Sequence, residues 1–163
     1  MLRWCAVTAL AVALSAAAPA WGAPIDDALA AYAGGNYAAA MTVARPLADA
    51  GDARAQTLVG RMIHLGQGTV SDDPLAQVWF LKAARQGNAE AQLATAKLYE
   101  LGEGINQNMG EAYAWAATAA QLGLAEAVAY RDTVATYISG TELAQAKRDA
   151  AKYWDDYGAP FKK

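Results

Sequence analysis

Residues 51–86 read GDARAQTLVGRMIHLGQGTVSDDPLAQVWFLKAARQ, and residues 87–122 read GNAEAQLATAKLYELGEGINQNMGEAYAWAATAAQL. The same residue types return in the same order, and Gly51, Gly87 and Gly123 stand at a constant spacing of 36 residues. A fixed period of about 20 to 50 residues is typical of stacked supersecondary units. The sequence therefore predicts a repeat protein, an architecture suited to holding partners.

Each unit is predicted to contain two helices. In the second unit Asn88 is a suitable N-cap, and most of the residues that follow it are helix formers. Gly102 and Gly104 then interrupt the helix, as Gly66 and Gly68 do one period earlier. Glycine favours this place because it accepts the left-handed backbone of a helix C-terminus. A second helix after the loop completes a helical hairpin.

The second helix of the first unit is predicted to begin with Asp73 as its cap and Pro74 at its first helical position. Its apolar stripe is predicted to contain Leu75, Val78, Trp79 and Ala83. A single hairpin cannot bury such a stripe, so neighbouring hairpins are expected to stack and complete the core. The repeated Trp79 and Trp115 are expected inside it.

The two ends of the array are predicted to be modified hairpins. Helices over 26–33 and 37–50 form the opening pair, and a helix over 125–138 is followed by a capping box at Ser139–Glu142 that starts the last helix. The predicted fold is therefore all-α, a right-handed α-solenoid of helical hairpins over residues 23–157. Residues 158–163 are predicted to be a flexible C-terminal tail.

The first 22 residues have the pattern of a secretory signal peptide. Arg3 precedes an uncharged run over residues 5–18, and small residues follow through Ala20 and Gly22. Cleavage after Ala20 and cleavage after Gly22 both fit. The run is shorter than the roughly 18 residues expected of a membrane-spanning helix. The protein is therefore expected in the periplasm or outside the cell, with membrane contact only through the uncleaved leader.

Composition argues against catalysis, metal binding and nucleic-acid binding. Thirteen Lys and Arg residues stand against 16 Asp and Glu residues, a balance that does not attract a phosphate backbone. The sole cysteine lies in the leader and the sole histidine is His64, whereas a zinc site usually takes several His or Cys ligands. Ser71 and Ser139 are explained by a loop and a cap. We expect no enzyme activity, no metal and no cofactor.

The two central units resemble Sel1-like repeats, which are relatives of the tetratricopeptide repeat. The residues of the first unit that match the family pattern are Ala53, Ala55, Gln56, Gly60, Met62, Gly66, Gly68, Ala76, Trp79, Phe80, Ala83, Ala84 and Gly87. Those of the second unit are Ala89, Ala91, Gln92, Ala96, Tyr99, Gly102, Gly104, Ala112, Trp115, Ala119, Ala120 and Gly123. Ile63 and Ala116 depart from the pattern, and Ala96 keeps the small residue but stands where the family has Gly; these differences should affect packing and not fold.

The resemblance implies a non-enzymatic protein-interaction module that binds a partner segment on the concave face of the array. It places the first helix of each unit on that face, with Arg54, Thr57, Arg61, His64, Glu90, Leu93, Lys97 and Glu100 as the binding residues. Among these, Arg61 and Lys97 are suited to hold a carboxylate of the bound segment.

Exported bacterial members of the family act in envelope signalling and assembly, so the expected partner is a periplasmic or envelope protein. Two alternatives remain open. The first is a cell-wall hydrolase like the cysteine-rich members, although this chain lacks their cysteine pairs. The second is a structural component of an envelope assembly.

Overall fold

A computed structural model describes residues 24–162, and within that range the chain forms eight α-helices, one short 3-10 helix and no strand. The predicted signal peptide over residues 1–22 lies outside the described residues. The helices are α1 (Pro24–Ala33), α2 (Tyr37–Asp49), α3 (Ala53–His64), α4 (Asp73–Ala84), α5 (Ala89–Leu101), α6 (Met109–Gln121), α7 (Ala125–Ala135) and α8 (Gly140–Tyr157). The 3-10 helix η1 (Ala159–Phe161) follows them.

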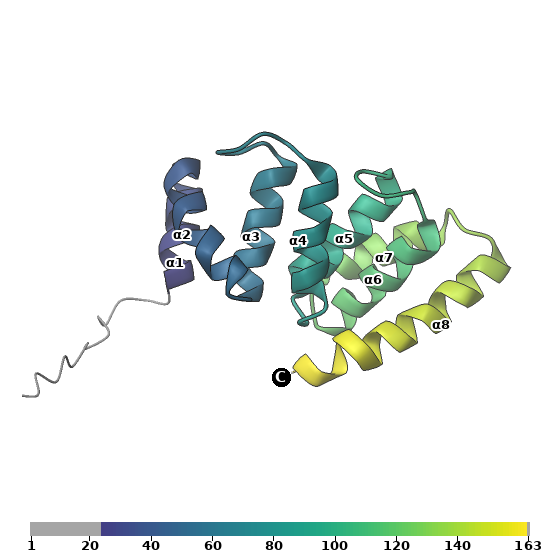
Figure 1. The fold of residues 1–163 in the computed structure, drawn as a ribbon. Coiled ribbons are helices and arrows are strands. Elements are labelled where there is room, and N and C mark those ends of the chain that lie inside the picture. The colour runs from purple at the N-terminus through teal and green to yellow at the C-terminus, as the bar shows by residue number, and fades with distance from the viewer. Residues whose placement is uncertain (1–23, 163) are drawn as a thin grey trace, which may run out of the picture.

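Consecutive helices pair into hairpins, and the hairpins stack in chain order (Figure 1). Helices α1 and α2, α3 and α4, and α5 and α6 form the pairs, while α2 packs on α3 and α4 packs on α5. The predicted all-α solenoid of helical hairpins is therefore confirmed. Within residues 24–162, none of the helices has the length and apolarity that crossing a membrane requires.

Short polar side chains begin most of the helices. Asp52 and Asn88 cap α3 and α5, each accepting a hydrogen bond from the backbone N–H three residues later. Ser139 does the same for α8. For α4, however, the predicted cap is wrong by one residue, because Asp72 accepts from the N–H of Leu75 at 2.9 Å. Asp73 is then the first helical residue, and its carboxylate is available for another contact.

The Gly-x-Gly loops lock each hairpin onto the preceding one. Gly104 has φ of 72°, and a Cβ atom there would lie 2.4 Å from the carbonyl carbon of Asp73 at the start of α4. One period earlier, Gly68 lies in the same way against Tyr37 at the start of α2. These glycines therefore do more than end helices, since they let the loop of one unit touch the backbone of its neighbour.

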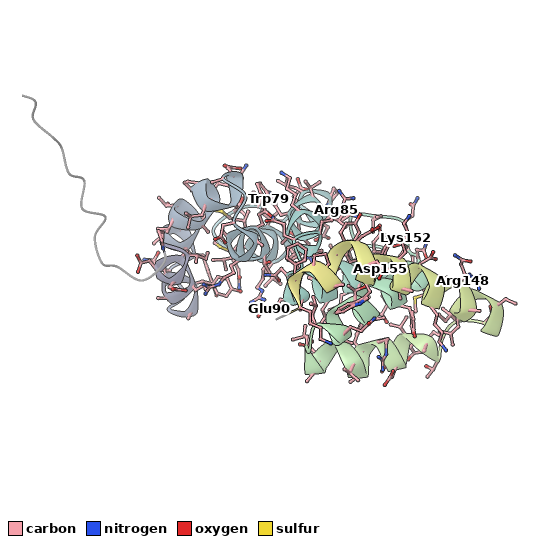
Figure 2. The ribbon with its side chains drawn as sticks, turned by 90° about the horizontal axis from the view of Figure 1, so that it is seen from below. Trp79, Arg85, Glu90, Arg148, Lys152 and Asp155 are labelled. Atoms are coloured by element: carbon pink, nitrogen blue, oxygen red, sulfur yellow. The ribbon has the colours of Figure 1, made fainter. Side chains whose placement is uncertain are left out.

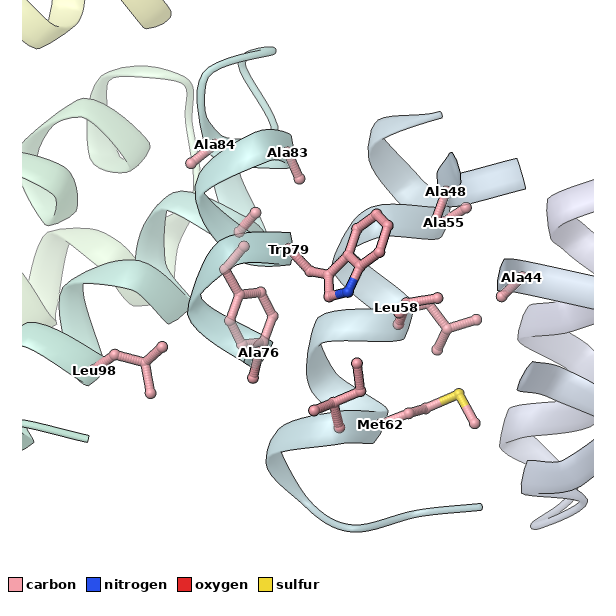
Figure 3. Packing of buried hydrophobic residues seen from close by; sticks show 14 of the residues in the cluster. Ala44, Ala48, Ala55, Leu58, Met62, Ala76, Trp79, Ala83, Ala84 and Leu98 are labelled. Carbon is pink, nitrogen blue, oxygen red and sulfur yellow. The ribbon is translucent and has the colours of Figure 1, made fainter. Parts of the chain in front are cut away.

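The core consists of alanines around a few large side chains. Trp79 of α4 is 4% exposed and lies between α4 and α3, near Ala55 and Ala83, which are fully buried (Figure 3). Alanine at these places lets the helix axes approach closely. The predicted stripe is partly wrong, because Leu75 and Val78 are exposed while Ala76 and Phe80 take the inward positions.

The last helix does not close a hairpin with α7. Instead α8 packs mainly against α6 and runs back along the array, so that the end of α8 lies near the middle of the array (Figure 1). Trp115 of α6, which is 3% exposed, packs against two rings of α8: Tyr153 in a tilted arrangement and Tyr157 in a stacked one, at centroid distances of 4.7 and 5.6 Å. Arg148 and Lys152 lie on the outer face of α8, as expected of a capping helix (Figure 2).

Residues that the sequence assigns to the C-terminal tail also contact the array. Just before the tail, the Nε2 atom of Gln92 donates to the backbone oxygen of Tyr157, the last residue of α8, at 2.9 Å. In η1, Phe161 lies so close to Gly87 that a Cβ atom on that glycine would lie 2.3–2.5 Å from the Phe161 side chain. The segment after α8 is thus seated against the repeat boundary at Gly87.

Candidate functional site: a groove along the first helices

A groove of about 410 Å³ runs along α3, α5 and the start of α7, the first helices of successive units. This is the face that the repeat resemblance predicts to be concave. Its lining residues are Thr57, Arg61, His64, Phe80, Glu90, Leu93, Ala94, Lys97, Leu98, Leu101, Glu103, Leu124 and Glu126. The groove combines an apolar floor with charged edges.

Six of the eight predicted binding residues line this groove, namely Thr57, Arg61, His64, Glu90, Leu93 and Lys97. Arg54 lies in an adjoining hollow beside Leu29 and Asn88. Glu100 does not line the groove, because its carboxylate accepts a hydrogen bond from the hydroxyl of Tyr130 on α7. Burial, followed by that hydrogen bond to Glu100, raises the pKa of Tyr130 well above its usual range.

The charged residues of this face pair with one another from unit to unit. Arg54 bonds to Asp26 at 2.7 Å, Arg61 to Glu90 at 3.2 Å, and Lys97 to Glu126 at 2.7 Å. Each pair joins the first helix of one hairpin to the first helix of the next. Arg61 and Lys97, predicted to hold a carboxylate of a bound segment, therefore already contact carboxylates of this chain.

These ion pairs are expected to add little stability. Lys97 and Glu126 are 44% and 65% exposed, and water screens exposed pairs so well that they contribute less than about 1 kcal/mol. We expect Lys97→Met to change the free energy of unfolding by less than about 1 kcal/mol. Urea unfolding of this variant, of Glu126→Gln and of the double variant measures the coupling. A coupling energy above about 2 kcal/mol would show that the pair holds the units together.

The floor of the groove is the part that the sequence does not predict. Phe80, Leu98, Leu101, Ala94 and Leu124 supply its apolar surface. Leu101 is 61% exposed, which is unusual for leucine on a helix of this array. Leu65 holds the same place one unit earlier and is 53% exposed, but it does not line the groove, so the repeat alone does not identify the floor.

At one end of the groove, His64 stands between two carboxylates. Its Nδ1 atom lies 2.7 Å from Oδ1 of Asp73, and its Nε2 atom lies 4.0 Å from Oε2 of Glu103. All three side chains are about one-third exposed. Within residues 24–162, they form one group whose candidate ligand atoms all lie within 4.8 Å of one another. This is the set of side chains in the described range best arranged to hold a metal ion.

Stacked hairpins with a groove along their first helices define an α-solenoid, a class of protein that presents extended surfaces to partners. Family comparison then names the repeat: the Sel1 repeat model matches residues 53–88 and again residues 89–124. Residues 53–124 thus consist of two Sel1 repeats, as the resemblance implies. Sel1 repeats generally serve as protein-interaction modules. No curated protein matched the sequence significantly.

Several solved structures are similar to this chain, and two of them show the extent of the likeness. One is c5321, described as a protective antigen of uropathogenic Escherichia coli with an SLR fold; its TM-score is 0.81 at 23% identity, over 84% of this chain and 30% of that one. The other is a Sel1 repeat protein from Oxalobacter formigenes, with a TM-score of 0.66 at 30% identity, over 79% of this chain and 55% of that one. The chain thus spans only part of the length of either protein, and the first likeness establishes the fold alone.

Proposed function

We propose that this protein is a non-enzymatic interaction module of the bacterial periplasm or envelope, which binds a segment of a partner protein in the groove along α3 and α5. The groove carries the proposal. Its volume of about 410 Å³ accommodates several side chains of a bound segment, and it follows the first helices, which the repeat resemblance predicts to line the concave face. The signal-peptide pattern of residues 1–22 supports the location.

The contacts within the groove indicate which partner chemistry it favours. Arg61 and Lys97 are already paired, so a carboxylate on the partner would have to displace Glu90 or Glu126. The floor, by contrast, exposes apolar surface at Leu101, whose burial by a partner is favourable at about 25 cal/mol per Å². The bound segment is therefore expected to insert apolar side chains, while the ion pairs set its position.

A charge placed on the floor tests this proposal. We expect Leu101→Glu to abolish recovery of a partner crosslinked to the protein in the native envelope, because a carboxylate buried between the apolar floor and apolar side chains of the partner would lose its hydration. Leu65→Glu is the matched control, since Leu65 has the same repeat position and is 53% exposed but does not line the groove. If the crosslinked partner is recovered equally well with Leu101→Glu and with Leu65→Glu, the groove is not part of the interface. Fractionation of the cells tests the location separately.

A further inference from the structure

We propose that His64, Asp73 and Glu103 form a binding site for a divalent transition-metal ion such as Zn²⁺, with His64 and Glu103 as direct ligands and Asp73 as the residue that orients the histidine. The proposal goes beyond partner binding and does not depend on it. It also revises the expectation from the sequence, in which a lone histidine argues against a metal site.

The contact between His64 and Asp73 sets the tautomer of the imidazole. An ionised carboxylate has no hydrogen to donate, so the 2.7 Å contact requires that Nδ1 of His64 carries the hydrogen and donates it to Asp73. In the neutral ring, Nε2 then has the free lone pair. A histidine whose second nitrogen donates to a carboxylate is the usual arrangement of a metal-binding histidine in proteins.

The free nitrogen faces the second ligand. Nε2 of His64 and Oε2 of Glu103 are 4.0 Å apart, whereas two ligand atoms on a tetrahedral zinc ion lie about 3.4 Å apart. Glu103 is 39% exposed and lies in the loop between α5 and α6, so a small side-chain rotation closes the difference. One nitrogen and one carboxylate are ligands that zinc accepts, and water supplies the remaining positions.

Stacking of the repeats creates this cluster, yet the repeat does not require it. Gly104 lies against the backbone of Asp73, and this contact carries the neighbouring Glu103 across to His64. At the preceding junction Gly68 makes the same contact with Tyr37, but Ala28, Tyr37 and Gln67 take the places of the three cluster residues. That junction packs without a histidine or a carboxylate. The three side chains at the second junction therefore exceed what the packing of the units needs.

The position of the cluster gives a bound ion a place in the groove. His64 and Glu103 both line it, next to the exposed Leu101. An ion held by two protein ligands keeps coordination positions that face the groove, where a carboxylate of a second molecule can replace water. Arg61 and Lys97, which the sequence predicts to hold a carboxylate of the partner, are already paired with Glu90 and Glu126. The metal ion would therefore supply the cationic group for that carboxylate.

The single histidine makes the test direct. Nitrogen-15 spectra of untagged protein contain the side-chain signals of one imidazole, and we expect Nε2 of His64 to shift on titration with ZnCl₂ while Nδ1 keeps its hydrogen. Calorimetry with ZnCl₂ is expected to show an affinity lowered about tenfold or more by His64→Ala and by Glu103→Gln. Asp73→Asn is expected to weaken binding less, because the amide oxygen still accepts from Nδ1.

Glu126→Gln is the matched control. It removes one carboxylate from the same groove but lies outside the cluster, so zinc affinity is expected to stay within about twofold of the original protein. Melting curves without zinc establish that each variant is folded. Glu103 lies in a loop between α5 and α6, so a folding defect is least expected for Glu103→Gln. Imidazole signals that do not move at millimolar ZnCl₂ would overturn the site. An equal loss of zinc affinity in Glu103→Gln and Glu126→Gln would also overturn it, because it would indicate only a general attraction of zinc to acidic residues.

Discussion

Trp115→Ala is expected to lower the free energy of unfolding by about 3–5 kcal/mol, the usual cost of deleting a large buried aromatic side chain. Trp115 is 3% exposed and packs against the rings of Tyr153 and Tyr157, so its removal opens a cavity between α6 and α8. Domains of this kind are stable by about 5–15 kcal/mol, which makes the loss a large fraction of the total. Chemical denaturation followed by circular dichroism measures it.

Two further variants separate the cavity from general effects of losing an aromatic residue. Tyr137→Ala removes a side chain that is 67% exposed, and we expect a change of less than about 0.5 kcal/mol. Trp115→Phe keeps an aromatic ring against α8 and should retain part of the stability. If Trp115→Ala unfolds at the same denaturant concentration as the original protein, the packing of α8 on α6 described above is incorrect.

Gly104→Ala is expected to cost about 2–5 kcal/mol through two additive effects. The residue has φ of 72°, and left-handed backbone costs a residue with a side chain about 1–2 kcal/mol. The new Cβ would also lie 2.4 Å from the carbonyl carbon of Asp73, so the backbone of the neighbouring unit must move. Overpacking of this kind costs about 1–3 kcal/mol. The thermal midpoint and the urea midpoint should both fall.

Gly35→Ala isolates the backbone contribution. Gly35 has φ of 75°, nearly the same as Gly104, but a Cβ there would meet nothing within 4 Å. We therefore expect this control to lose only the left-handed penalty of about 1–2 kcal/mol. The difference between the two variants measures the contact between units. Equal losses at both positions would mean that the Gly-x-Gly loop merely ends a helix and does not lock the hairpins together.

The residues of the groove show how much of a binding site the local sequence pattern can predict. The sequence places Arg61 and Lys97 on the correct face because they hold the same position in successive units, 36 residues apart, and Arg61 follows helical spacing with Arg54, Thr57 and His64. It does not predict that Glu90 and Glu126 pair with them, since those contacts join residues 29 positions apart across a helix–helix interface. Spacing within one helix carries no information on which side chains of the next unit face it.

The cap of α4 illustrates the same limit on a smaller scale. Asp72 and Asp73 are both suitable N-caps, and Pro74 fits the first or second helical position. Tertiary contacts decide between them, because Gly104 packs against the backbone of Asp73 and His64 bonds to its carboxylate. The one-residue difference is what brings Asp73 into the cluster at the end of the groove.

The sequence by itself determines the hairpins, their period and the stacking of the central units, because caps, glycines and apolar spacing act over a few residues and recur every 36. Only the tertiary structure decides where α8 packs and which charges pair. It also brings His64 to Glu103, 39 residues further along the chain. These outcomes depend on how whole hairpins fit together. The contacts that stabilise them join residues of different units, so no local sequence pattern records them.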